Sequence, residues 1–203
     1  MLTIAHRGAM SRGLQNTPEG VRVAVRLGAD FVELDIVRRG DGAFHCVHGP
    51  GPGSPLSHCL TAIGEGMGLV AHLKGSFPDS DIGRLLTEIP VHLPLERVIF
   101  ASHRGGVLQR LRAIAPGARL ARFGLPPALA ALWRRPVWEI ALVNQAVLWR
   151  GLVRALQARG LTVCASCVWE FRSRAAVEGL GVDGAFVNLS GRGNWGTLAN
   201  PAT

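Results

Sequence analysis

The sequence contains no tyrosine, and only one of its 22 basic residues is a lysine. The other basic residues are arginines scattered along the chain, and none of them forms a basic run with interleaved aromatic residues. The net charge of +8 therefore does not by itself indicate a nucleic-acid surface. The single lysine, Lys74, favours a point-charge contact to a phosphate. We expect a small anionic partner and no nucleic acid.

Long apolar runs are also absent. No run reaches the length of a membrane span, and the apolar start, Met1 to Ala5, is too short for a secretion signal. We therefore predict a cytoplasmic chain without a transmembrane segment. The chain has four cysteines, two of which form a C-x-x-C pair, Cys164 and Cys167. Because this pair lies within an apolar run, a buried strand is favoured over a redox centre.

The sequence does contain a regular alternation of short apolar segments and helical segments over its 203 residues. No linker divides it, so we predict a single domain, residues 1–203. Alternating strands and helices predict a parallel sheet, and eight such units predict a closed (β/α)8 TIM barrel. The predicted strands begin at Leu2, Phe31, Leu69, Val98, Arg119, Trp138, Leu161 and Gly184.

Local signals add detail to this plan. Thr17 followed by Pro18 is typical of a helix start, and a long amphipathic helix is predicted from Gln145 to Ala158. The turn signal Asp41-Gly42 separates the second strand from a further extended run, Ala43 to Val47, by only a few residues. Since a parallel crossover needs about a dozen residues, this run must fold back as a β-hairpin extension after the second strand.

Two acidic residues, Glu33 and Asp35, interrupt the apolar strand Phe31 to Val37. They are two residues apart, so both side chains point to the same face of the strand. Buried carboxylates are costly unless their charge is compensated. A divalent cation that prefers oxygen ligands, Mg²⁺ or Ca²⁺, would supply that compensation. An ion pair with arginine inside the barrel is the structural alternative.

Polar residues recur where the predicted strands end. In a barrel these ends form one mouth, where catalysis takes place. We expect Ser102, His103 and Trp169 to line the pocket there, since no third group accompanies the serine and histidine to make a nucleophile. The residues placed at the mouth are His6, Arg7, Glu33, Asp35, His48, His72, Lys74, Ser102, His103, Ser166, Trp169 and Asn188.

The chain resembles the glycerophosphodiester phosphodiesterases, which are metal-dependent (β/α)8 barrels. The matching segments are Ala5-His6-Arg7-Gly8, Asn16-Thr17, Gly28-Ala29-Asp30, Glu33-Leu34-Asp35-Ile36, Asp41-Gly42 and Val47-His48, followed more sparsely by Leu73-Lys74, Ser102 and Gly181-Val182-Asp183-Gly184. The resemblance implies hydrolysis of a glycerophosphodiester to glycerol phosphate and an alcohol, a reaction of lipid metabolism. It identifies the chain as a divergent, shortened member of the family.

The resemblance also implies three groups of site residues. Two histidines act as general acid and base, two cations hold the substrate phosphate, and a cluster of ligands holds a divalent metal. The acid–base pair is His6 and His48, the phosphate-binding pair is Arg7 and Lys74, and the metal ligands are Glu33, Asp35 and His72.

Several positions depart from the family pattern. His72 replaces a glutamate ligand, so Mn²⁺ or Zn²⁺ joins Mg²⁺ and Ca²⁺ as a candidate metal. The insertion that usually follows the second histidine is much reduced. The remaining replacements are Gln15 for Glu, Gly49 for Asp, Ser166 for Trp and Asn188 for Asp. Two functions stay open: a phosphodiesterase, hydrolytic or cyclising, and a non-catalytic or remodelled barrel that binds a phosphorylated ligand or partner.

Overall fold

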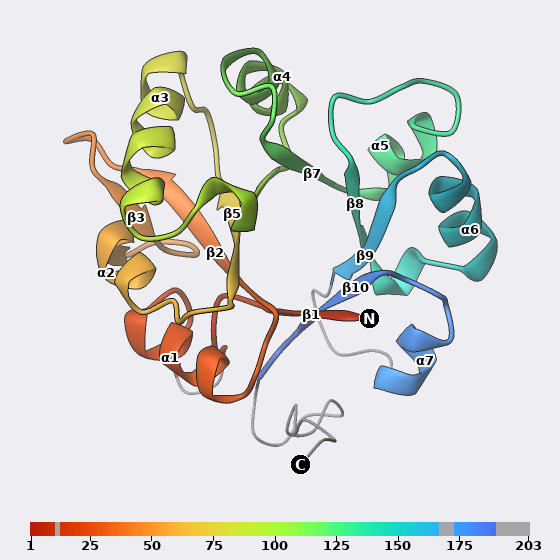
Figure 1. Cartoon of the computed structure of the whole chain (residues 1–203), viewed down its shortest axis with the longest axis horizontal. Coiled ribbons are helices and arrows are strands. Elements are labelled where there is room, and N and C mark those ends of the chain that lie inside the picture. The colour runs from red at the N-terminus through yellow and green to blue at the C-terminus, as the bar shows by residue number, and fades with distance from the viewer. Residues whose placement is uncertain (11–12, 167–172, 190–203) are drawn as a thin grey trace.

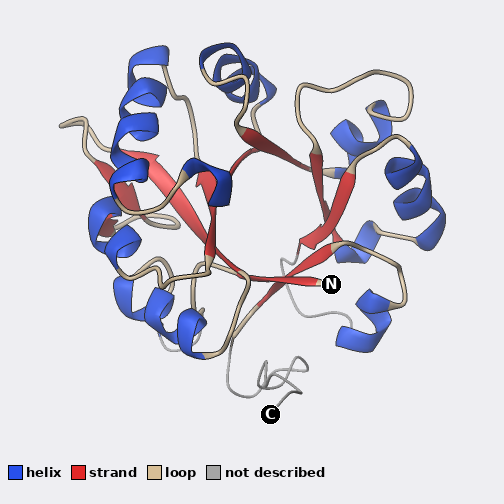
Figure 2. Cartoon of the chain, viewed as in Figure 1, coloured by secondary structure: helices blue, strands red, loops and turns tan. Residues whose placement is uncertain are grey.

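The structure is a computed structural model that describes residues 1–10, 13–166 and 173–189. A ring of strands is enclosed by helices (Figures 1 and 2). The ring strands all pair in parallel, and β1 closes it by pairing with both β10 and β2. The predicted (β/α)8 barrel is therefore confirmed. The eight strands are β1 Leu2–Ala5, β2 Phe31–Arg38, β5 Gly68–Leu73, β6 Val98–Ser102, β7 Arg119–Phe123, β8 Ile140–Asn144, β9 Thr162–Ser166 and β10 Gly184–Val187.

Helices cover the outside of this ring. The first helix begins as predicted, because the Thr17 hydroxyl accepts a hydrogen bond from the Gly20 amide and Pro18 occupies the first turn. Within the described residues, no helix is long and apolar enough to cross a membrane. The helices are α1 Pro18–Arg26, α2 Leu56–Thr61, α3 Asp79–Glu88, α4 Gly105–Ile114, α5 Leu125–Ala130, α6 Arg150–Ala158 and α7 Arg174–Glu178, with 3₁₀ turns η2 Ile89–Val91, η3 Leu95–Arg97 and η4 Gln145–Val147.

The predicted hairpin extension is present. Strand β3, Phe44–Cys46, pairs antiparallel with β2, and Cys46 lies opposite Ile36. A two-residue strand β4, Ser54–Pro55, pairs antiparallel with β3, and α2 follows it directly. This compact arm carries the chain from the second barrel strand to the third and brings residue 48 back toward the barrel mouth.

Two predicted boundaries around β8 were wrong. The strand begins at Ile140 instead of Trp138. The helix predicted from Gln145 begins only at Arg150, because the Asn144 side chain caps a separate 3₁₀ turn and Trp149 is extended, with φ −138° and ψ 154°. The amphipathic pattern continues through these residues, but the side-chain cap ends the regular period.

The strands have two apolar faces, as the period of two requires. On β2, the side chains of Val32, Leu34 and Ile36 are buried in the main core beneath the helices. A second, smaller core fills the barrel interior with residues from the other strands. Its members include Ile4, Val70, Ile99, Ala121, Phe123, Leu142 and Phe186. The inward-facing positions just above this inner core are therefore the ones available for a site at the mouth.

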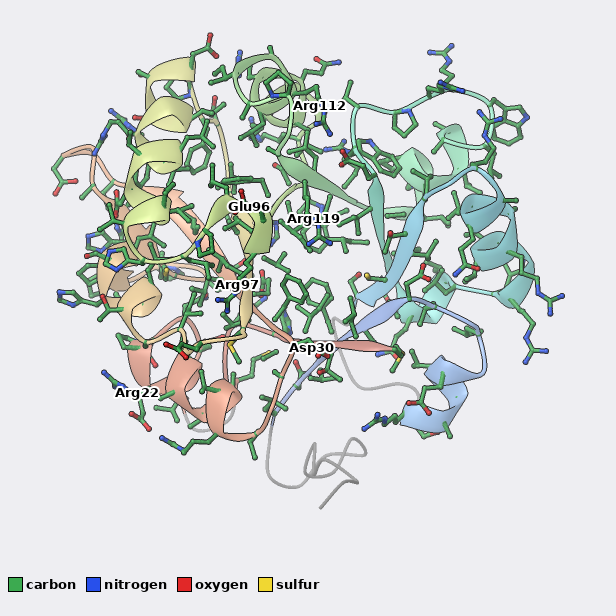
Figure 3. All side chains as sticks on the ribbon, in the orientation of Figure 1. Arg22, Asp30, Glu96, Arg97, Arg112 and Arg119 are labelled. Atoms are coloured by element: carbon green, nitrogen blue, oxygen red, sulfur yellow. The ribbon has the colours of Figure 1, made fainter. Side chains whose placement is uncertain are left out.

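On the opposite face of the barrel, where the strands begin, acidic side chains accept hydrogen bonds from the backbone amides of neighbouring strands. Figure 3 shows this face, with Asp30, Arg97 and Arg119 labelled. The Asp30 Oδ2 atom accepts a hydrogen bond of 2.7 Å from the backbone amide of Thr3. The same device recurs twice, with Glu139 accepting from the Leu120 amide at 2.9 Å and Asp183 from the Val163 amide at 2.7 Å. The Gly181 to Gly184 motif is thus accounted for by strand pairing.

We expect Asp183→Ala to lower the free energy of unfolding by about 1–3 kcal/mol, because it leaves the Val163 amide without its charged acceptor. Urea denaturation followed by circular dichroism measures the change. Glu96→Ala, an exposed acid on the same face (Figure 3), is the control and should change stability by no more than about 0.5 kcal/mol. Equal effects of the two substitutions would contradict a stabilising role for the hydrogen bond between Asp183 and the Val163 amide.

Candidate functional site

A cavity of about 500 Å³ lies at the ends of the barrel strands. The predicted acid–base, phosphate-binding and metal-binding residues all line it, and so does His103. The side chains that line it are His6, Arg7, Met10, Glu33, Asp35, His48, His72, Lys74, His103, Phe123, Leu125, Asn144, Ser166 and Phe186, together with the backbone of Gly124. The fold therefore brings together in one cavity residues from all eight barrel strands or the loops that follow them, together with His48 after the hairpin strand β3.

The loop after β1 has an unusual backbone. Arg7 and Asn16 have positive φ values of 54° and 57°, a conformation that is uncommon for non-glycine residues and that clusters at functional sites. The turn aims the Arg7 amide at Glu33 Oε2, 3.0 Å away. Asn16 holds Asp35 twice: its Oδ1 accepts from the Asp35 amide at 2.9 Å, and its Nδ2 donates to Asp35 Oδ2 at 3.2 Å. The loop thus fixes both acids of β2.

Asp35 is the hub of the site. Its Oδ2 atom lies 3.0 Å from Arg7 Nε and 3.1 Å from His48 Nδ1. Its Oδ1 atom lies 2.9 Å from Lys74 Nζ and 3.2 Å from His72 Nδ1. Since the Asp35 side chain is buried, these partners compensate its charge. The ion pair with arginine, the structural alternative to a metal, is thus present at Asp35.

The ion pairs of this cluster shift the pKa values of Asp35 and His72 so that both favour their charged forms. Burial alone would raise the pKa of Asp35, but the hydrogen bond from His72 and the charge of Lys74 outweigh it and hold the pKa well below its usual range. Burial would likewise lower the pKa of His72, but its bonds to Asp35 and Glu33 raise it. Asp35 is therefore ionised at neutral pH, and the two carboxylates favour the charged form of His72.

Glu33, Asp35 and His72 satisfy a basic requirement for a shared metal ion. One ligand atom from each lies within 4.8 Å of the other two. His72 Nδ1 is 3.1 Å from Glu33 Oε1 and 3.2 Å from Asp35 Oδ1. Donors that share one ion at metal–ligand distances of about 2.1 Å are themselves about 3.0–3.4 Å apart, so these residues fit a divalent metal that accepts mixed nitrogen and oxygen ligands.

The two predicted catalytic histidines have different partners. His6 is buried, and its Nδ1 lies 2.8 Å from Asn188 Oδ1. Because an amide oxygen only accepts hydrogen bonds, Nδ1 carries the proton there and Nε2 presents a lone pair. The side chain of His48 is 44% exposed and contacts the Asp35 carboxylate instead. The pair therefore combines one shielded imidazole and one that can reach solvent.

Aromatic rings line the wall beside the predicted metal ligands. Phe123 stacks against both His72 and His103, with ring centroids 4.3 Å and 4.6 Å away, and the two imidazoles lie 5.2 Å from each other. Burial, followed by the positive charges of His72, Lys74 and Arg122, lowers the pKa of His103 to about 4. His103 is therefore a neutral wall residue at neutral pH.

Two further expectations for the pocket wall have different outcomes. The expectation for Ser102 was wrong: it is fully buried, and its hydroxyl donates to the Leu73 carbonyl and accepts from the Arg104 amide. The pleat of β6 turns residue 102 away from the barrel and residue 103 into it. Trp169 and Cys167 lie outside the described residues, whereas Cys164 is buried within β9, as the strand reading of the C-x-x-C segment required.

Some site residues were not predicted from the sequence. Phe123, Phe186, Leu125 and Met10 line the cavity, but an apolar residue at a strand end has the same pattern as a core residue. Asn16 belonged to a matching segment without a role. Its positive φ, a conformation that Asn adopts more readily than most residues, is visible only in the structure.

Residues 6–62 match the sequence model of the glycerophosphoryl diester phosphodiesterase family. No protein with a curated description matches the chain. Solved structures match in fold over nearly the whole chain. A phosphodiesterase from Oleispira antarctica, solved with the product sn-glycerol-3-phosphate, is 19% identical, with a TM-score of 0.79 over 93% of each chain.

Two glycerophosphodiester phosphodiesterases show the same likeness. The protein from Parabacteroides distasonis is 17% identical, with a TM-score of 0.76 over 93% of this chain and 92% of that one. The protein from Thermotoga maritima is 16% identical, with a TM-score of 0.70 over 93% and 94%. The match to the family model covers the loop and strands that carry His6, Glu33, Asp35 and His48, and the shared barrel extends over the rest. The chain is therefore similar in sequence to the glycerophosphoryl diester phosphodiesterase family over residues 6–62, and it shares the barrel fold of these structures over nearly its whole length.

Proposed function

We propose that this chain hydrolyses a glycerophosphodiester, or a similar small phosphodiester, to a phosphate monoester and an alcohol by metal-dependent His/His acid–base catalysis. The observation that carries the proposal is the meeting of two imidazoles, two cations and a Glu/Asp/His cluster around one cavity. This combination supplies proton transfer and charge neutralisation, the two requirements of phosphodiester cleavage.

The cations and the metal ligands bind the phosphate. Arg7 and Lys74 both border the cavity and are anchored on Asp35, so their remaining N–H groups can contact the non-bridging oxygens. Glu33, Asp35 and His72 would hold the divalent metal, which when bound supplies Lewis-acid neutralisation of the phosphate. His72 favours Mn²⁺ or Zn²⁺ more than a third carboxylate would, although Mg²⁺ and Ca²⁺ remain candidates.

The two histidines move the protons. We assign His6 as the base, because its Nε2 presents a lone pair to the cavity side while Asn188 fixes the ring. It takes a proton from the attacking water or substrate hydroxyl as the new P–O bond forms. His48 gives its proton to the leaving alkoxide as the old P–O bond breaks. The Asp35 carboxylate supports this role by orienting the ring, since its Oδ2 atom lies 3.1 Å from His48 Nδ1.

Metal removal and replacement test this proposal. We expect chelation to abolish hydrolysis of glycerophosphodiesters and of an aryl phosphodiester, and add-back of Mn²⁺ or Zn²⁺ to restore at least as much activity as Mg²⁺ or Ca²⁺. Metal binding is followed in parallel by calorimetry. His72→Glu, which makes the ligand set all-oxygen, should shift the preference toward Mg²⁺. Full activity in the chelated protein would refute metal dependence.

One observation favours the second candidate, a barrel that binds a phosphorylated ligand without cleaving it. Arg7 and Lys74 already pair with Asp35, so the charge of this carboxylate is compensated by side chains of the chain itself. Binding of sn-glycerol-3-phosphate together with no hydrolysis under any metal would establish this alternative. A cytoplasmic location and a role in lipid metabolism stay predictions from the sequence.

A further inference from the structure

The cavity has two chemically different sides. Its ionic side, from β1, β2, the hairpin arm and β5, holds the acids, cations and catalytic histidines. The other side comes mainly from the ends of β6 to β10. Within the described residues, it has no charged side chain and its polar side chains are few. We call it the carbon side: it is formed mainly by Phe123, Leu125, Phe186 and Met10, with His103, Asn144 and Ser166 as polar members.

The rings on this carbon side form a continuous wall that reaches the reaction centre. Phe123, stacked on His72, contacts Phe186 edge-on with centroids 6.0 Å apart. Phe186 in turn contacts the ring of His6 edge-on at 5.9 Å. Both phenyl rings are buried. If Arg7 and Lys74 hold the phosphate, one of its ester arms would therefore contact the phenyl rings of this wall.

Hydroxyl recognition would need hydrogen-bonding groups on this wall. The Asn144 side-chain oxygen already accepts from the Ala146 amide at 2.9 Å. Among the described residues of this wall, the Asn144 amide nitrogen, Ser166 and His103 are then the few groups that could meet a hydroxyl. A site that hydrogen-bonds a substrate hydroxyl rejects an analogue lacking it by about 10⁴-fold, since its polar groups are then left unpaired. An apolar wall has no such penalty and gains about 0.8 kcal/mol for each buried methylene.

We propose that the carbon side is a subsite for an uncharged, carbon-rich ester arm, such as an alkyl chain, and that it does not select for glycerol hydroxyls. This inference rests on the proposed function, because it assumes that phosphate binds on the ionic side. It makes the natural substrate a phosphodiester with at least one apolar arm.

Binding of phosphate monoesters tests the subsite without depending on turnover. The probes are inorganic phosphate, sn-glycerol-3-phosphate, propyl phosphate and hexyl phosphate, measured by calorimetry on the metal-loaded full chain. Propyl phosphate has the three carbons of glycerol phosphate but no free hydroxyl. We expect it to bind at least as tightly as glycerol phosphate, and hexyl phosphate to bind at least tenfold more tightly than propyl phosphate.

A variant pair links the chain-length effect to the wall. Leu125→Asn places a polar group at the half-buried start of α5 and should reduce the hexyl-to-propyl affinity ratio at least threefold. Val91→Asn, 77% exposed and outside the cavity lining, is the matched control and should leave that ratio unchanged. Thermal melting confirms that both variants are folded.

The binding results distinguish failure of the carbon subsite from failure of the proposed function. Tenfold tighter binding of glycerol phosphate than of propyl phosphate, or affinities independent of chain length, would overturn the carbon subsite and leave the proposed function standing. Absence of binding by every phosphate, inorganic phosphate included, would overturn both.

Discussion

His6→Gln should lower kcat for phosphodiester hydrolysis about 10³-fold while KM changes only a few-fold. General acid–base catalysis contributes about 10²–10⁴-fold, and glutamine has no titrating nitrogen to accept the proton. Glutamine is close to histidine in size, so the contact with Phe186 and the hydrogen bond to Asn188 can persist. The effect should therefore fall on the chemical step and not on the fold.

The control for this substitution is His58→Gln on the exposed surface of α2, which should leave kcat unchanged. His48→Gln should show a loss of the same order as His6→Gln. The pH dependence of kcat/KM supplies an independent readout. Each variant should lose one limb of the bell-shaped profile, and the two should lose opposite limbs if His6 is the base and His48 the acid. A loss of less than tenfold in both variants would exclude the His/His mechanism.

Asp35→Asn should reduce kcat/KM by about 10³-fold or more and weaken metal binding. The carboxylate contacts His48, His72, Arg7 and Lys74, so its loss disturbs proton transfer, metal ligation and phosphate binding together. The asparagine keeps the shape but not the charge. We expect the free energy of unfolding to fall by about 2–3 kcal/mol, less than for a fully buried pair, because both cations retain some contact with water.

The pH dependence of stability gives a second readout for this substitution. The pKa of Asp35 is lower in the folded chain than in the unfolded one, so its stabilisation is complete above the unfolded value of about 3.9 and is lost as the pH falls. Between pH 5 and pH 2 the metal-free wild type should therefore lose stability more steeply than Asp35→Asn, by up to about 1.4 kcal/mol per pH unit.

Asp41→Asn is the matched control for Asp35→Asn. Asp41 lies exposed in the hairpin turn, and an asparagine can keep its hydrogen bond to the Ala43 amide. This variant should retain wild-type activity, metal affinity and acid stability. An Asp35→Asn protein that matched it in all three would show that Asp35 is not the hub of the site.

Local patterns in the sequence were sufficient for several features. The period of two on β2 placed Glu33 and Asp35 on one face, opposite Val32, Leu34 and Ile36. The short link through Asp41 and Gly42 required an antiparallel arm, which the pairing of β2 with β3 confirms. These predictions succeed because each depends on residues only a few positions apart.

Local patterns did not predict the contacts between segments that are distant in the sequence. Asn188 lies 182 residues from His6, and only closure of the ring by β1 and β10 brings the two together. Asn16 reaches Asp35 through a loop whose positive φ value no propensity required. The phenyl wall of Phe123 and Phe186 spans two strands that are far apart in sequence.

The sequence by itself determined the eight-unit barrel, the carboxylate face of β2, the hairpin arm and the set of ionisable residues at the mouth, because strand period and link length are local properties. Only the tertiary structure decided that Ser102 faces away, that Asp35 joins both cations and two histidines, and that Phe123 and Phe186 line the opposite wall. The physical reason is that closing a barrel sets, for every strand at once, which residue of its final pleat faces the shared interior.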